Sequence, residues 1–131
     1  DTPPGISTAR TAGYLQWRYS FGPLRYRALP LGGDLADGVI VFRVRGRGTA
    51  TELTVCDVLA PPRQRVGRAI GYLLRNTGAD YAIRTVGRGS LRAGFAPAPN
   101  LGPILTWREV CREGTPEMSD LALTLGDVEL F

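Results

Sequence analysis

The chain has 131 residues and a formal net charge of +4, and all sixteen of its basic residues are arginine. It contains no lysine and no histidine, which excludes Schiff-base enzymes, P-loop phosphate sites, serine–histidine triads and histidine metal sites. Two cysteines, Cys56 and Cys111, cannot form a structural zinc site alone, so no metal is expected. We expect both as reduced, buried thiols, with a single disulfide between them as the alternative.

One domain with one hydrophobic core is the expectation for a chain of this length. In residues 1–38 we expect a loose arm over the first ten residues, a short helix and loops, and in residues 39–131 a sheet with its helix. No apolar run approaches the roughly 20 residues of a membrane-spanning helix, and no secretory signal is evident, so a cytoplasmic protein without membrane contact is expected. The start at Asp1 is typical of a processed product or of a piece of a longer protein.

Positive charge is concentrated in the middle third of the chain. Residues 43–92 carry ten arginines against three acidic side chains, a net of +7, whereas residues 93–131 carry two arginines against six acidic side chains, a net of −4. The middle third is expected to attract an anion, either a small phosphate ligand or a nucleic acid. A solvated arginine surface is the alternative.

The first half of the chain predicts a short helix followed by a β-hairpin. Thr11 is a suitable cap for a helix over residues 12–19, and Gly and Pro turn signals fill residues 22–38. Two β-rich runs, 39–45 and 49–59, are joined by a short glycine loop, which is typical of a hairpin.

The second of these runs predicts an interior strand. Its alternation places Leu53, Val55, Asp57 and Leu59 on one face, and Cys56 and Val58 on the other. Because apolar residues lie on both faces, we expect the strand to be covered on two sides. Asp57 is then expected as a buried partner for an arginine.

Beyond this strand the apolar spacing changes to that of one helix face. The stripe consists of Val66, Ala69, Ile70, Leu73 and Leu74. Arg75 and Gly78 are typical of a helix C-terminus, and a further strand is expected over residues 81–86. A strand, a helix and a strand at this distance predict a parallel βαβ unit with a right-handed crossover.

The last part of the chain is less regular. Residues 87–103 are rich in Gly and Pro with a short turn at 90–93, and a strand is expected over 104–110. The apolar positions change phase at Gly126, which predicts a bulge or a tight turn there. Together the elements predict an α/β fold: a mixed β-sheet with a parallel βαβ unit and one main crossover helix.

The junction between the interior strand and the helix is the most informative segment. A helix N-terminus presents unpaired N–H groups and a partial positive charge, and so binds phosphates. No Ser, Thr, Asp or Asn caps this turn, and Gly67 and Ala69 leave the backbone approachable. Arg63, Arg65 and Arg68 add charge that can pair with a pyrophosphate. An ordinary proline-led helix start with exposed arginines is an equally good interpretation of these residues alone.

Residues 64–69, Gln-Arg-Val-Gly-Arg-Ala, match the pattern Q/R-x-x-G-x-G/A. The chain here resembles the GNAT acyltransferase superfamily, whose acyl-CoA motif has this pattern between a strand and a helix. Residues 91–95 resemble the Gly-Phe element that often follows the family's next strand and helix. The similarity covers about residues 39–110, the second half of a GNAT fold. Residues 17–19 and 125–131 resemble C-terminal portions of larger, two-lobed GNAT-like proteins, so the chain is expected to be one GNAT-like domain or lobe.

The resemblance implies a binding site for acetyl-CoA as a cosubstrate. The backbone N–H groups of residues 65–69 would hold the pyrophosphate, and strand segment 56–59 would hydrogen-bond the pantetheine arm. The cofactor-binding residues that it implies are Cys56, Val58, Leu59, Gln64, Arg65, Val66, Gly67, Arg68 and Ala69. Glu52, which opens the interior strand, is the candidate general base, with a solvated or cross-strand-paired carboxylate as the alternative.

Three functions follow from these observations. The leading one is an acyl-CoA-dependent N-acyltransferase, acting from acetyl-CoA on an amine acceptor, or the C-terminal lobe of such an enzyme. The first alternative is a non-catalytic GNAT-like lobe that completes a sheet or forms a dimer. The second is an arginine-rich nucleic-acid-binding module, which predicts aromatic side chains among the arginines. Under the leading interpretation the partners are an acyl-CoA, an amine acceptor, and a second copy or a missing N-terminal lobe, and nucleic acid is not expected.

Overall fold

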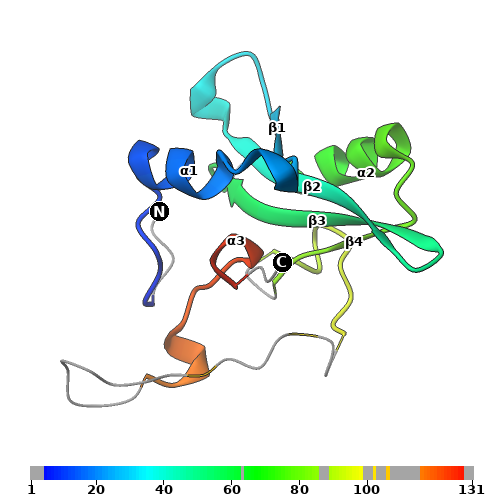
Figure 1. Ribbon diagram of the computed structural model, residues 1–131. Coiled ribbons are helices and arrows are strands. Elements are labelled where there is room, and N and C mark those ends of the chain that lie inside the picture. The colour runs from blue at the N-terminus through cyan, green and yellow to red at the C-terminus, as the bar shows by residue number, and fades with distance from the viewer. Residues whose placement is uncertain are drawn as a thin grey trace.

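The chain forms a four-stranded mixed sheet with a crossover helix on one face. The computed structural model describes residues 5–62, 64–85, 89–98, 102, 106 and 116–128. Three α-helices and four strands lie in these ranges, with three 3-10 turns labelled η: α1 (Ala12–Tyr19), η1 (Gly22–Leu24), β1 (Arg27–Pro30), η2 (Leu35–Asp37), β2 (Val39–Arg47), β3 (Ala50–Leu59), α2 (Val66–Thr77), β4 (Tyr81–Ile83), η3 (Met118–Asp120) and α3 (Leu125–Val128). The strand order is β1-β2-β3-β4 (Figure 1). β3 and β4 are parallel and the other pairs antiparallel, which confirms the predicted mixed sheet and βαβ unit.

The first helix forms as predicted, but the strand that follows it was not predicted. The Thr11 side chain accepts a hydrogen bond from the Tyr14 N–H and so caps α1. β1 was expected as part of a turn-rich loop, yet it pairs with residues 39–42 of β2. Its alternation is too short to stand out in the sequence, and Pro30 is tolerated because β1 is an edge strand.

A β-bulge in β3 reverses the expected faces of its second half. Phe42 pairs with Val55 and Val41 pairs with Asp57, so Cys56 is an extra residue on β3. The prediction that Asp57 shares a face with Val55 is therefore wrong, because one inserted residue shifts every later side chain to the opposite face. For the same reason Val58 lies with Val55 on the apolar face, and Leu59 lies with Asp57. Both faces of β3 are covered, since every residue from 52 to 57 is buried.

The apolar face of the sheet packs against α2. The helix covers residues Val66–Thr77 and ends at Gly78, whose φ of 67° is the left-handed conformation that glycine adopts readily. The predicted stripe faces the sheet: the buried core consists of Ile40, Phe42, Leu53, Val55, Ile70 and Leu73, with Val66, Ala69 and Leu74 packed against it. Figure 1 shows α2 above the strands and α3 below them.

The two ends of the described chain meet beside the other face. Ile6 forms a parallel bridge with Leu121, with the Ile6 N–H donating to the Asp120 carbonyl at 2.6 Å and the Ala122 N–H donating to the Ile6 carbonyl at 2.9 Å. Residues 5–10 are therefore not the loose arm that was expected. The sequence could not indicate this, because Leu121, the partner of Ile6, lies more than 100 positions away. The predicted turn at Gly126 is present as the single helical turn α3.

Of the two strands predicted after α2, one is shorter than predicted and the other lies almost entirely outside the described residues. The strand expected over residues 81–86 ends at Ile83, and residues 84 and 85 belong to no element. The strand expected over 104–110 lies outside the described residues, apart from Thr106, and so do Cys111 and Arg63. Across the part of the chain that is described, no helix has the length and apolarity needed to cross a lipid bilayer.

Candidate functional site

The parallel pair β3–β4 separates before β3 ends. Pairing is limited to three residue pairs, from Glu52–Tyr81 to Thr54–Ile83. β3 continues for five more residues to Leu59, and within the described residues no strand pairs with this stretch on the β4 side. The bulge at Cys56 adds twist at the point where the two strands separate. A backbone edge is thus left beside the carboxyl end of the parallel pair, which is where open α/β sheets bind ligands.

The N-terminus of α2 comes next in the chain, and six residues, 60–65, separate it from this end of β3. Arg65 is the N-cap residue, with φ −86° and ψ 70°, and it makes no side-chain capping hydrogen bond. No acidic residue lies in the first turn, as the sequence predicted, and the side chains of Arg65 and Arg68 are exposed. The Val66 and Arg68 N–H groups donate to the Gln64 and Arg65 carbonyls at 3.1 and 3.0 Å. The helix dipole and the two exposed arginines therefore remain as the features that favour an anion at this end of α2.

Gly67 is packed against protein backbone. A Cβ at this position would lie 3.0 Å from the Ala93 Cα and 3.2 Å from the Ala93 carbonyl oxygen. Ala93 belongs to a turn over residues 89–94, and the side chain of Phe95, the next residue, packs against the core. The glycine is therefore required by the close approach of this turn to α2. Gly67 holds two parts of the fold together whether or not a ligand binds beside it.

The other predicted cofactor residues lie together, but most of their side chains face protein. Val58, Val66 and Ala69 pack against the apolar core. The Gln64 amide donates to Asp37 at 3.4 Å. For the motif segment, this leaves the backbone and the side chains of Arg65 and Arg68 as the groups able to contact a ligand.

The remaining two predicted positions belong to the strand. Cys56 is a buried thiol whose Sγ donates to the Thr54 carbonyl at 3.7 Å, as expected for an unreactive cysteine. Leu59, the last residue of β3, is partly buried. Both can contribute to a site only through their backbone groups.

Glu52 lies at the opposite end of β3 and is enclosed by donors. It is seven residues from Leu59, about 23 Å along an extended strand. Its carboxylate accepts hydrogen bonds from Arg45 Nε at 2.7 Å, Thr54 Oγ1 at 2.9 Å and Tyr81 Oη at 3.1 Å. Burial would raise the pKa of Glu52, but these hydrogen bonds outweigh burial and leave the pKa below its ordinary value. The cross-strand pair that was the alternative is confirmed, and these contacts suit an ionised structural carboxylate.

Acid should remove the stabilisation that Glu52 and Asp127 provide. Burial would raise the pKa of Asp127, but hydrogen bonds from Arg10 and the Thr124 backbone lower it below the ordinary value. A carboxylate with a lowered folded-state pKa stabilises the fold above its unfolded pKa of about 4, and this stability is lost as pH falls through the folded pKa. Urea unfolding at pH 7, 5, 4 and 3 should therefore show a steep loss below about pH 4. Glu52→Gln should flatten this decline, and an unchanged slope would contradict the assignment.

A buried ionic cluster joins both ends of the chain to β3. Asp57, 1% exposed, accepts hydrogen bonds from Arg10 Nε and Nη2, both at 3.1 Å, and from the Tyr19 hydroxyl. Arg10 Nη2 also donates to Asp127 Oδ2 at 2.7 Å and to Thr124 Oγ1 at 2.8 Å. Burial would lower the pKa of Arg10, but its hydrogen bonds to the two aspartates raise it. The predicted arginine partner of Asp57 is confirmed, although local spacing could not identify Arg10, 47 positions away.

A second arginine, Arg18, connects α1 to α3 beside this cluster. Arg18 Nε donates to the Gly126 carbonyl at 2.6 Å, and the Arg18 guanidinium lies over the Tyr19 and Tyr26 rings at 5.8 and 5.7 Å. Trp17, in the same helix, is 72% exposed and lies outside the core.

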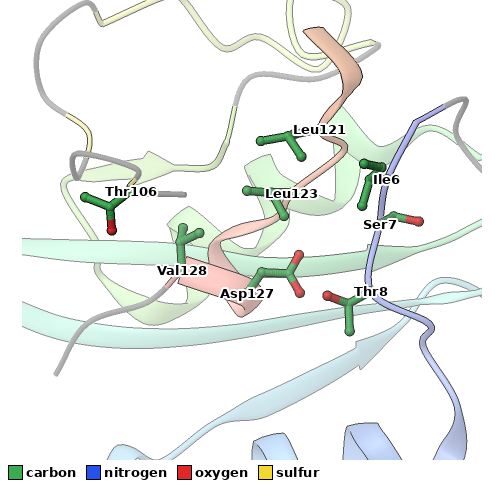
Figure 2. Close-up of a pocket in the computed structure, with 8 residues that line it drawn as sticks. All are labelled: Ile6, Ser7, Thr8, Thr106, Leu121, Leu123, Asp127 and Val128. Atoms are coloured by element: carbon green, nitrogen blue, oxygen red, sulfur yellow. The ribbon is translucent and has the colours of Figure 1, made fainter. Parts of the chain in front are cut away.

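A shallow depression of about 390 Å³ lies between the two ends of the chain. Its lining consists of Ile6, Ser7, Thr8, Thr106, Leu121, Leu123, Asp127 and Val128. Figure 2 shows the arm residues on one side, Leu121, Leu123 and Val128 on the other, and Asp127 near Thr8. Because Asp127 is already paired with Arg10, it is a structural group here rather than an available base.

Comparisons with protein-family models, curated proteins and solved structures found no match. Within the described ranges, no group of three or more Cys, Asp or Glu side chains is placed to hold a metal ion. A functional interpretation therefore depends on the geometry at the end of β3 and the start of α2.

Proposed function

We propose that this chain binds an acyl-CoA where β3 separates from β4, and that it is an N-acyltransferase or the C-terminal lobe of one. The observation that carries the proposal is the five-residue extension of β3 beyond Thr54, which the chain follows, after residues 60–65, with the N-terminus of α2, where no side chain caps the helix. An extended backbone edge next to an anion-binding helix end matches a ligand with an amide-bearing arm and a pyrophosphate. The GNAT-like motif at residues 64–69 lies at this position.

The two parts of the ligand would be held by different forces. The pantetheine arm would lie along residues 56–59 and exchange hydrogen bonds with the strand backbone, as an added strand does. The pyrophosphate would lie at the start of α2, where Arg65 and Arg68 would add charge-assisted hydrogen bonds. Gly67 would act indirectly in this proposal, by allowing the 89–94 turn to approach the helix.

The proposed reaction is direct transfer of the acyl group. An acceptor amine attacks the thioester carbonyl, the bond from carbon to sulfur breaks, the thiolate leaves, and the amine loses a proton to a base. Glu52 is not assigned as that base, since its buried carboxylate is already paired with Arg45 and accepts hydrogen bonds from Thr54 and Tyr81. Because the chain has no lysine, no side-chain amine of its own can be the acceptor.

Thermal unfolding with and without acetyl-CoA tests the proposal. At a ligand concentration of 100 times Kd, binding should stabilise the fold by about 2.7 kcal/mol, or about 10 °C in Tm for a chain of this size. The double variant Arg65→Glu/Arg68→Glu should lose most of this shift, since it reverses two charges beside the pyrophosphate. It is a cleaner probe than a change at Gly67, where any side chain would meet the Ala93 backbone.

The matched control is Arg25→Glu/Arg27→Glu, which reverses two exposed arginines near β1 and should keep the full shift. No acetyl-CoA shift in the wild-type chain would contradict the proposal and favour a non-catalytic lobe. An equal shift in the two double variants would contradict the placement of the pyrophosphate.

A further inference from the structure

The exposed face of α2 carries a line of three arginines and one tyrosine. Arg65, Arg68, Tyr72 and Arg75 follow one another at spacings of three, four and three residues, so they lie within one narrow stripe of the helix. All four are exposed, Tyr72 by 49%, while the opposite face packs against the core. From Arg65 to Arg75 the stripe is about 15 Å long.

The charge of this stripe is not neutralised by nearby acids. α2 contains no acidic residue. Of the three acids among residues 43–92, Glu52 is buried in ion pairs with Arg45 and Arg47, and Asp57 is buried with Arg10. Two of the three acidic side chains among residues 43–92 are thus paired with other arginines and do not neutralise the stripe.

The Arg75 side chain lies along the surface of α2. A Cβ on Gly71 would be 3.5 Å from Arg75 Nη1, so this side chain folds back over the preceding turn of the helix. The missing side chain at residue 71 leaves room for this conformation. Tyr72 lies between Arg68 and Arg75 along the stripe, and an exposed ring with neighbouring arginines combines a stacking surface with phosphate-binding charges.

We infer that the exposed stripe of α2 is a binding surface for a single-stranded nucleic acid. The arginines contact consecutive phosphates and Tyr72 stacks on an unpaired base. A single strand fits better than a duplex, because stacking on Tyr72 needs an accessible base face. The stripe shares Arg65 and Arg68 with the proposed pyrophosphate position, whereas Tyr72 and Arg75 lie farther along α2 and belong to the stripe alone.

Fluorescence anisotropy with a labelled 12-nucleotide single strand of mixed sequence, at several salt concentrations, tests this inference. Three phosphate contacts predict a slope of log affinity against log salt of about −2, from about −0.7 for each contact. Tyr72→Ala should weaken binding about 5- to 150-fold, the loss of one stacked base. Arg75→Ala should make the slope shallower by about 0.7.

Arg27→Ala is the control, because it removes the same charge from an exposed site on β1 and should leave affinity within about twofold. Equal affinity of Tyr72→Ala and wild type would overturn the inference. So would tighter binding to the matching duplex, or to phosphatidylserine vesicles with no binding to the single strand. Arg75→Ala should keep its acetyl-CoA shift, since Arg75 lies about 15 Å from the start of α2, and this separates failure of the inference from failure of the proposed function.

Discussion

Replacing Asp57 by alanine is expected to lower the free energy of unfolding by about 3–5 kcal/mol, the largest effect of any single substitution considered for this chain. The Asp57 side chain is 1% exposed and is the shared acceptor for Arg10 and Tyr19. Its removal leaves the Arg10 guanidinium, itself only 15% exposed, with one carboxylate in place of two. The cost is that of an incompletely compensated buried charge rather than of one lost hydrogen bond.

Urea unfolding at pH 7, followed by tryptophan fluorescence, measures this loss. Tyr19→Phe, which removes one of the donors to Asp57, should cost about 1–1.5 kcal/mol and gives the scale of a single hydrogen bond. The double variant Arg10→Ala/Asp57→Ala should be less destabilised than the sum of the two single variants, because neither charge is then left buried alone. A loss below about 1 kcal/mol for Asp57→Ala would contradict the central position of this aspartate.

The local elements of the fold were predictable because short-range signals encode them. The Thr11 cap fixes the start of α1, and the apolar spacing from Val66 to Leu74 gives both the limits of α2 and the face that it buries. The hairpin of β2 and β3 follows from two β-rich runs around a glycine loop. In each of these elements the residues that decide the structure lie within about twenty positions of one another.

Long-range pairing could not be predicted in the same way. The bulge at Cys56 depends on how β3 matches β2, and strict alternation therefore placed Asp57 on the wrong face. Arg10 meets its carboxylate partners 47 and 117 positions away, so the arm looked loose in the sequence. The candidate site shows the same division. Its motif was visible in residues 64–69, but the contact between Gly67 and Ala93 exists only in the folded chain.

Gly126→Ala should destabilise the fold by about 1–3 kcal/mol, although alanine is the better helix former. Gly126 is buried in α3, and a Cβ there would lie 2.7 Å from Asp57 Oδ2 and in still closer contact with the Tyr19 hydroxyl. To make room, α3 must move away from β3. That movement would lengthen the bonds that Arg10 and Arg18 make to this segment.

The same substitution at Gly71 in α2 should change the stability in the opposite direction. Its Cβ would meet only Arg75 Nη1, at an ordinary 3.5 Å, so alanine should stabilise the fold by about 0.5–1 kcal/mol. Urea unfolding of the two variants under identical conditions should therefore give shifts of opposite sign. Adding Tyr19→Phe should reduce the cost of Gly126→Ala, since it removes the hydroxyl that the new methyl group meets. Stabilisation by Gly126→Ala would show that α3 does not pack against Asp57, because only that close approach makes a methyl group at residue 126 unfavourable.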